Sequence, residues 1–113
     1  MSENKLVYVE LPANSTAEMK AFYGSLFGWS FQDWGTEYTA FSESGLDGGC
    51  NAGKEDRTTA PLLVIETADI QAMEVRVQEA GGTVTRATFQ FPGGRRFHFI
   101  DPSGNELAVM QHD

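Results

Sequence analysis

The sequence has few cysteines and few basic residues. Cys50 is its single cysteine, so no disulfide can form within the chain. Lysine and arginine number 8 against 16 aspartates and glutamates, which gives a formal net charge of −8 at pH 7. Nucleic acid and anionic membranes are both bound through basic surfaces. The composition therefore predicts neither nucleic acid nor membrane as a partner.

Long apolar runs are also missing. No stretch approaches the roughly 18 apolar residues that a membrane-spanning helix needs. Residues 1–5 show no basic segment followed by an apolar core, so no signal peptide is expected. Together with the single cysteine, this predicts a cytoplasmic protein. The 113 residues, 41% of them hydrophobic, are enough for one domain with its own core.

The first half of the chain predicts a strand, a helix and three further strands. Lys5–Leu11 is apolar and rich in valine, which favours a buried strand. Ser15 and Glu18 have the spacing of a capping box, and Gly28 is placed to end the helix. We expect one apolar stripe of this helix to pack on the sheet: Met19, Phe22, Tyr23, Leu26 and Phe27. The strands that follow are expected at 29–33, 36–41 and 49–52.

The second half repeats this order. Leu62–Glu66 predicts a strand, Asp69 or Thr67 a helix N-cap, and Gly81-Gly82 the helix end. Its expected core-facing residues are Ile70, Met73, Val77 and Ala80. Strands are then expected at 83–91, 94–100 and 106–112, with a turn at 101–104 between the last two.

An offset of 54 residues superposes the two halves. It places Ser15 on Asp69, Gly28 on Gly82 and Tyr8 on Leu62. The economical interpretation is a duplication. The predicted fold class is α+β: a single domain, 1–113, of two βαβββ modules at about 5–53 and 60–113. Together the modules are expected to form a curved mixed sheet around a cleft.

Strand alternation predicts which side chains line that cleft. If Val7, Val9 and Leu11 face the first helix, their neighbours face the cleft. The same argument applies to the second module if Phe97 and Phe99 face its helix. The cleft is then lined by Tyr8, Glu10, Leu62, Val64, His98, Ala108 and Met110.

Several short motifs occur in a distinctive order. They are Phe22-Tyr23, Leu26-Phe27-Gly28-Trp29, Ala80-Gly81-Gly82 and Asp101-Pro102-Ser103-Gly104-Asn105. In order and spacing the chain resembles the glyoxalase/bleomycin resistance/extradiol dioxygenase superfamily, also called vicinal oxygen chelate. The resemblance implies paired βαβββ modules and usually a homodimer. In catalytic members it implies a divalent metal held by His, Gln or Glu on the first and last strands of each module.

The ligand positions that the resemblance implies carry unsuitable side chains. They fall on Tyr8, Leu62 and Ala108, while the last strand of the first module offers Cys50 but no carboxylate before Glu55. Leucine and alanine cannot bind a metal, and a tyrosine phenol would first have to lose its proton. We therefore expect neither a metal nor another cofactor.

A few polar and aromatic residues remain candidates for a site. Glu10 and His98 could act as acid or base or contact a ligand, although each could instead be a paired structural group. Trp29, Trp34 and Tyr38 could stack on a flat ligand, and Trp34, beside Gly35, is the better candidate at the rim. Arg96, with its neighbour Arg95, could clamp an anion or pair with surface carboxylates.

Three functions fit these residues. The first is metal-free binding of a small apolar or aromatic molecule in the cleft, with Glu10 and His98 supplying polar contacts. The second is a divalent-metal-dependent lyase, isomerase or dioxygenase, similar to lactoylglutathione lyase, with ligands from atypical places such as Glu10, His98 or His112. The third is a dimerisation module without a ligand. Whether the chain is an enzyme stays open at this point.

Overall fold

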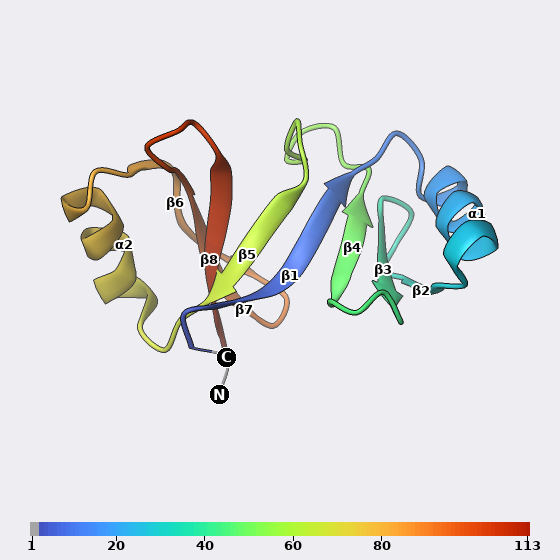
Figure 1. Cartoon of the computed structure of the whole chain (residues 1–113), viewed down its shortest axis with the longest axis horizontal. Coiled ribbons are helices and arrows are strands. Elements are labelled where there is room, and N and C mark those ends of the chain that lie inside the picture. Colours follow the sequence, from blue (N-terminus) through green and yellow to red (C-terminus); the bar gives the residue numbers. More distant parts are fainter. Residues whose placement is uncertain (1–2) are drawn as a thin grey trace. The chain divides into compact units, whose positions relative to one another are not determined.

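The computed structural model describes residues 3–113. Met1 and Ser2 lie outside the described residues. They belong to residues 1–5, where no signal peptide is expected. The described residues form two compact units (Figure 1). The N-terminal unit is Tyr8–Leu62, and the C-terminal unit is Leu63–Asp113 together with the described residues up to Val7.

The N-terminal unit contains one helix and a mixed sheet. Its elements are β1 (Lys5–Pro12, from Tyr8 onward), α1 (Thr16–Phe27), β2 (Ser30–Asp33), β3 (Tyr38–Ser42) and β4 (Gly48–Asn51). The strand order is β2-β3-β4-β1. β1 runs parallel to β4, and the other neighbours are antiparallel.

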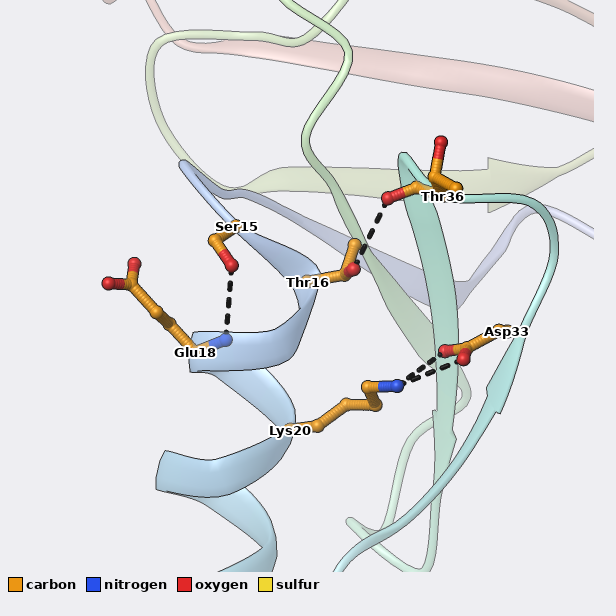
Figure 2. Close-up of polar contacts among 6 residues, drawn as sticks. All are labelled: Ser15, Thr16, Glu18, Lys20, Asp33 and Thr36. Atoms are coloured by element: carbon orange, nitrogen blue, oxygen red, sulfur yellow. Dashed lines mark hydrogen bonds and ion pairs between the residues drawn. The ribbon is translucent and has the colours of Figure 1, made fainter.

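The ends of α1 are fixed by the residues that predicted them. The Ser15 side chain accepts a hydrogen bond from the Glu18 backbone N–H at 3.2 Å, as Figure 2 shows. Gly28 ends the helix in the left-handed region at φ 74°. Figure 2 also shows Lys20 of α1 reaching Asp33 at the end of β2, with N···O distances of 2.9 and 3.0 Å. These contacts confirm the predicted helix and tie it to β2.

The predicted packing of the α1 stripe is wrong for most of its residues. Phe22, Leu26 and Phe27 are 56%, 59% and 62% exposed. Met19 does pack against the core of this unit, and Tyr23 stacks on Trp29 at 4.8 Å. The core itself is built from Ala13, Phe41 and Cys50, with Val9, Leu11, Trp29, Phe31 and Ala52 around them. Aromatic rings that follow the helix therefore fill the space that the stripe was expected to fill.

The C-terminal unit repeats the same order of elements. They are β5 (Leu62–Glu66, from Leu63 onward), α2 (Ile70–Glu79), β6 (Thr83–Phe91), β7 (Gly94–Ile100) and β8 (Glu106–His112). The strand order is β5-β8-β7-β6, with β5 parallel to β8 and the rest antiparallel. Of the two candidate N-caps it is Asp69 that caps α2, accepting from the Ala72 N–H at 3.1 Å.

The core of the C-terminal unit confirms the predicted phase of its hairpin. Ile70, Phe97 and Val109 are buried together, and Phe99 packs against them from the same strand as Phe97. Phe97 and Phe99 therefore face α2. The turn is closed by the Asp101 carboxylate, which accepts from the backbone N–H groups of Ser103 and Asn105, both at 2.9 Å.

The α+β fold class is therefore confirmed. Each set of βαβββ elements forms a mixed sheet with one helix. The module boundaries at about 5–53 and 60–113 stay a prediction. Among residues 3–113, no helix has the length and apolar character needed to cross a membrane.

Candidate functional site

In the N-terminal unit, β1 presents two different faces. Val9 and Leu11 pack into the core beside Cys50. Because successive side chains of a strand alternate, Tyr8 and Glu10 lie on the opposite face, away from that core. Strand alternation predicted this face for both residues.

A buried polar cluster occupies this face. The hydroxyl oxygens of Tyr8 and Tyr38 are 2.5 Å apart, and the Tyr38 hydroxyl donates to Glu10 Oε2 at 3.2 Å. The Asn51 side-chain amide donates to the other carboxylate oxygen of Glu10 at 3.5 Å. Glu10 is only 5% exposed. Because the Tyr38 O–H group donates its hydrogen bond to Glu10, the Tyr38 oxygen can only accept from the Tyr8 hydroxyl. The hydrogen bonds therefore run from Tyr8 through Tyr38 to Glu10.

Gly49 makes this cluster possible. It pairs with Glu10 on β1 and with Ala40 on β3. A Cβ atom at this position would lie 2.4 Å from the Tyr38 hydroxyl, closer than any real contact of that kind. The absence of a side chain on β4 therefore lets the tyrosine reach across the strand to the carboxylate.

The electrostatics of the cluster keep Tyr38 protonated. Burial raises the pKa of Tyr38 well above its ordinary value, and the nearby charge of Glu10 and the Tyr8 phenol raise it further. A hydroxyl that does not ionise remains a hydrogen-bond donor. Its chemical role is thus to hold and orient the carboxylate.

Other predicted residues of this unit lie elsewhere. Trp34 is in the turn between β2 and β3, exposed and outside the buried cluster. Cys50 is fully buried on the core side, and burial raises the pKa of its thiol to about 11, which leaves a poor nucleophile. This supports the interpretation of Cys50 as a small buried apolar residue.

In the C-terminal unit, the strand register aligns the remaining predicted residues. Val64 on β5 pairs with Ala108 on β8, which pairs with His98 on β7. The next row joins Met110 on β8 to Arg96 on β7. Both rows lie on the face opposite Phe97 and Val109, which pack with α2. Leu62, the first residue of β5 and the last residue of the N-terminal unit, is also buried.

His98 is the central polar group of this face. It is 2% exposed, and its Nδ1 lies 2.9 Å from Glu106 Oε2. Burial lowers the pKa of His98; the hydrogen bond to Glu106 acts in the opposite direction, and the charges of Arg96 and Arg86 lower it further. A neutral imidazole that donates from Nδ1 to the carboxylate has Nε2 as an acceptor. His112, by contrast, is exposed at the end of β8, where its Nε2 lies 3.1 Å from Glu66.

The donor set does not fit the divalent metal of catalytic relatives. Of the three implied positions, Tyr8 carries a phenol hydrogen-bonded to Tyr38, and Leu62 and Ala108 carry no donor atom. On β4, Cys50 faces the core and Gly49 has no side chain. Within the described part of the chain, no three His, Cys, Asp or Glu side chains are grouped in a way that could hold a metal ion.

Sequence reasoning missed two members of the polar cluster. The sequence suggested Tyr38 only as a stacking ring, although its alternation with Phe41 on β3 could have placed it on the Glu10 face. Asn51 gave no signal, because its position depends on where β4 ends and on its bonds to the following loop. The Gly53 N–H donates to the Asn51 side chain at 2.8 Å, and that side chain donates to Asp56 at 3.4 Å.

Comparison with known proteins supports the resemblance. Residues 5–109 match the family model described as Glyoxalase/Bleomycin resistance protein/Dioxygenase superfamily. No curated protein matches the sequence.

Three solved structures illustrate the likeness of fold. A structure described as NAD-dependent benzaldehyde dehydrogenase from Legionella pneumophila has a TM-score of 0.76 at 16% identity, covering 94% of this chain and 98% of that one. A glyoxalase/bleomycin resistance protein/dioxygenase superfamily member from Vibrio splendidus 12B01 has a TM-score of 0.71 at 16% identity, covering 96% and 98%. The Mn(II)-bound glyoxalase from Novosphingobium aromaticivorans has a TM-score of 0.70 at 20% identity, covering 97% of this chain and 39% of that one.

Proposed function

The chain belongs to the glyoxalase/bleomycin resistance protein/dioxygenase superfamily, and from this premise we propose that it binds a small apolar or aromatic molecule without a metal ion. The observation that carries the proposal is the Tyr8–Tyr38–Glu10 cluster. It fills the first-strand ligand position with a hydrogen-bonded phenol, and the ring of Tyr38 excludes any side chain at Gly49.

The remaining proposed contact residues are mostly apolar. Ligand sites commonly combine an apolar lining with a few placed polar groups. Here Glu10 and His98 are the polar groups, each held by a named hydrogen bond. The proposed lining is Tyr8, Trp34, Leu62, Val64, Ala108 and Met110. The cleft itself stays a prediction.

A thermal-shift screen tests this proposal. A molecule that binds only the folded chain raises its melting temperature, by an amount that grows with ligand concentration. We expect hits among small aromatic and apolar compounds, and we expect the shifts to persist in excess EDTA. A library without hits, or shifts that vanish with EDTA and return with one divalent metal, would overturn the proposal.

The second candidate function is a metal-dependent lyase, isomerase or dioxygenase like lactoylglutathione lyase. The fold likeness to the Mn(II)-bound glyoxalase favours it. It would require ligands from places other than those the family uses, such as Glu10, His98, His112 or a partner subunit. Turnover that depends on a stoichiometric metal distinguishes it from metal-free binding.

We also infer a cytoplasmic homodimer. Phe22, Leu26 and Phe27 give α1 a cluster of exposed large apolar side chains, and such clusters often mark protein interfaces. Light scattering coupled to gel filtration should give twice the chain mass of 12.4 kDa. A monomer at all concentrations would contradict the inference. If the dimer forms but the ligand screen finds nothing, the chain is a dimerisation module.

A further inference from the structure

The sheet of the C-terminal unit ends in a strand whose pairing is interrupted. β6 is the last strand in the order and lies next to β7, where Arg86 pairs with His98. The register shifts on both sides of this row: from Val84 to Arg86 and from Arg86 to Phe89, β6 advances by one residue more than β7 does. Such an extra residue is a β-bulge, which disrupts the ladder locally. Regular pairing therefore breaks off on both sides of the Arg86–His98 row.

The imidazole in this row is buried and only half hydrogen-bonded. His98 Nδ1 lies 2.9 Å from Glu106 Oε2, but within residues 3–113 no group bonds to its buried Nε2. The nearest aromatic ring of β6 is that of Phe89, 5.9 Å from the imidazole, with the Arg86 guanidinium 3.6 Å from the Phe89 centroid. β6 therefore meets His98 through an aromatic ring and gives Nε2 no hydrogen bond.

The formal charges in the rows around His98 balance while the imidazole is neutral. They are two arginines and two glutamates: Arg86 on β6, Arg96 on β7, Glu106 on β8 and Glu66 on β5. Glu66 also lies 3.1 Å from His112 Nε2 at the end of β8. The helix α2 is on the other face of the sheet, against Phe97. A proton on His98 would thus add an uncompensated positive charge.

Protonation is unfavourable while β6 is in place. It turns Nε2 into a donor that has no acceptor, and a buried charge without partners is costly. Burial lowers the pKa of His98 most; the hydrogen bond to Glu106 raises it, and the charges of Arg96 and Arg86 lower it. Once β6 moves away, water can accept from Nε2 and burial is relieved. Opening of this strand is therefore coupled to uptake of a proton.

We propose that the Arg86–His98 row makes the edge of the C-terminal sheet acid-sensitive: when His98 takes up a proton, β6 opens locally while the rest of the chain stays folded. The bulges on either side of the row separate it from the regular ladder, which allows this part of the strand to open by itself. The inference concerns a conformational response of the chain and does not depend on the proposed ligand.

Native-state hydrogen exchange of the full chain tests this, measured by NMR at pH 7.5 and 5 in low concentrations of urea. Local opening exposes little surface, so its equilibrium depends weakly on urea, whereas global unfolding depends on it strongly. We expect the β6 amides to exchange through an opening that urea hardly affects. From pH 7.5 to 5 its equilibrium constant should rise about 3- to 30-fold; an open state with the ordinary histidine pKa of about 6.5 sets the upper value.

Two variants identify the titrating group. His98→Gln keeps a polar side chain that does not titrate in this range, so the rise should disappear. Glu106→Gln is isosteric and removes the charge that favours the imidazolium, so the rise should be at least as large as in the unaltered chain. The second variant also separates His98 from Glu106, since a rise caused by protonation of Glu106 would vanish in it.

The inference fails if the β6 amides exchange only through global unfolding, with the urea dependence of the β3 and β4 amides. It fails equally if the rise survives in His98→Gln or vanishes in Glu106→Gln. Should His98→Gln not fold, the ¹⁵N resonances of the His98 ring in the unaltered chain decide. Protonation of this ring above pH 5 with β6 still protected would show that proton uptake does not open the strand.

Discussion

At the scale of single residues, the buried cluster is specified as much by an absent side chain as by those present. Tyr38 reaches Glu10 only because position 49 is glycine. The carboxylate then has donors from β3 and β4 on its two oxygens. A charge taken out of water needs such donors, since burying it without them is costly.

Gly49→Ala tests this dependence. The added methyl would overlap the Tyr38 hydroxyl, so we expect a loss of about 1–3 kcal/mol in the free energy of unfolding. Gly24→Ala is the matched control: there a Cβ has ordinary contacts, 3.6 Å at the closest, inside α1. Alanine favours a helix by about 1 kcal/mol over glycine, so the control should gain stability. Urea unfolding measures both, and equal effects would refute the overlap.

His98 predicts how stability depends on pH. Its folded pKa is below the unfolded value of 6.5, so the unfolded chain binds the extra proton first and the free energy of unfolding rises with pH in this window. The stability is complete above about pH 6.5 and declines as the pH falls below it. His98→Gln should flatten the profile between pH 7.5 and 5. A profile that keeps its slope in His98→Gln would contradict this.

At the scale of elements, local signals predicted the helices well and their packing less well. Caps depend on adjacent residues, so Ser15, Gly28 and Asp69 could be identified from the sequence and are confirmed. The apolar stripe of α1 was assigned to the core because periodicity shows only that a face is apolar. Which neighbour fills the core depends on tertiary packing, and here Trp29 lies between Tyr23 and Phe41, 4.8 Å from each ring.

The packing of α1 makes a prediction about its stripe. Met19→Ala should lower the free energy of unfolding by about 1–2 kcal/mol, because Met19 packs against the core. Phe22→Ala removes a larger side chain but should cost less than about 0.5 kcal/mol, since Phe22 is mostly exposed. Urea unfolding at low protein concentration gives both values. The reverse order would mean that the stripe is buried after all.

The sheet face on which a strand residue lies could be predicted from the sequence, but its hydrogen bonds could not. Alternation placed Tyr8, Glu10 and His98 away from the helix-side cores, and the observed core residues of both units agree. The hydrogen bonds between these residues and Tyr38, Asn51 or Glu106 were not predictable. They depend on strand register and on contacts between distant segments, which periodicity does not encode.

At the scale of the whole molecule, the chain has a superfamily fold whose implied metal positions are Tyr8, Leu62 and Ala108. The fold can therefore be retained while the donor set changes, because fold and function are separable. The central proposal for this member is that it binds its ligand without a metal ion.

Native mass spectrometry of the purified protein, before and after chelation, is the test of this proposal. We expect the mass of the chain or its dimer, with at most an organic ligand that survives chelation. A stoichiometric zinc, nickel, manganese or iron ion, lost on chelation together with the ligand, would contradict it.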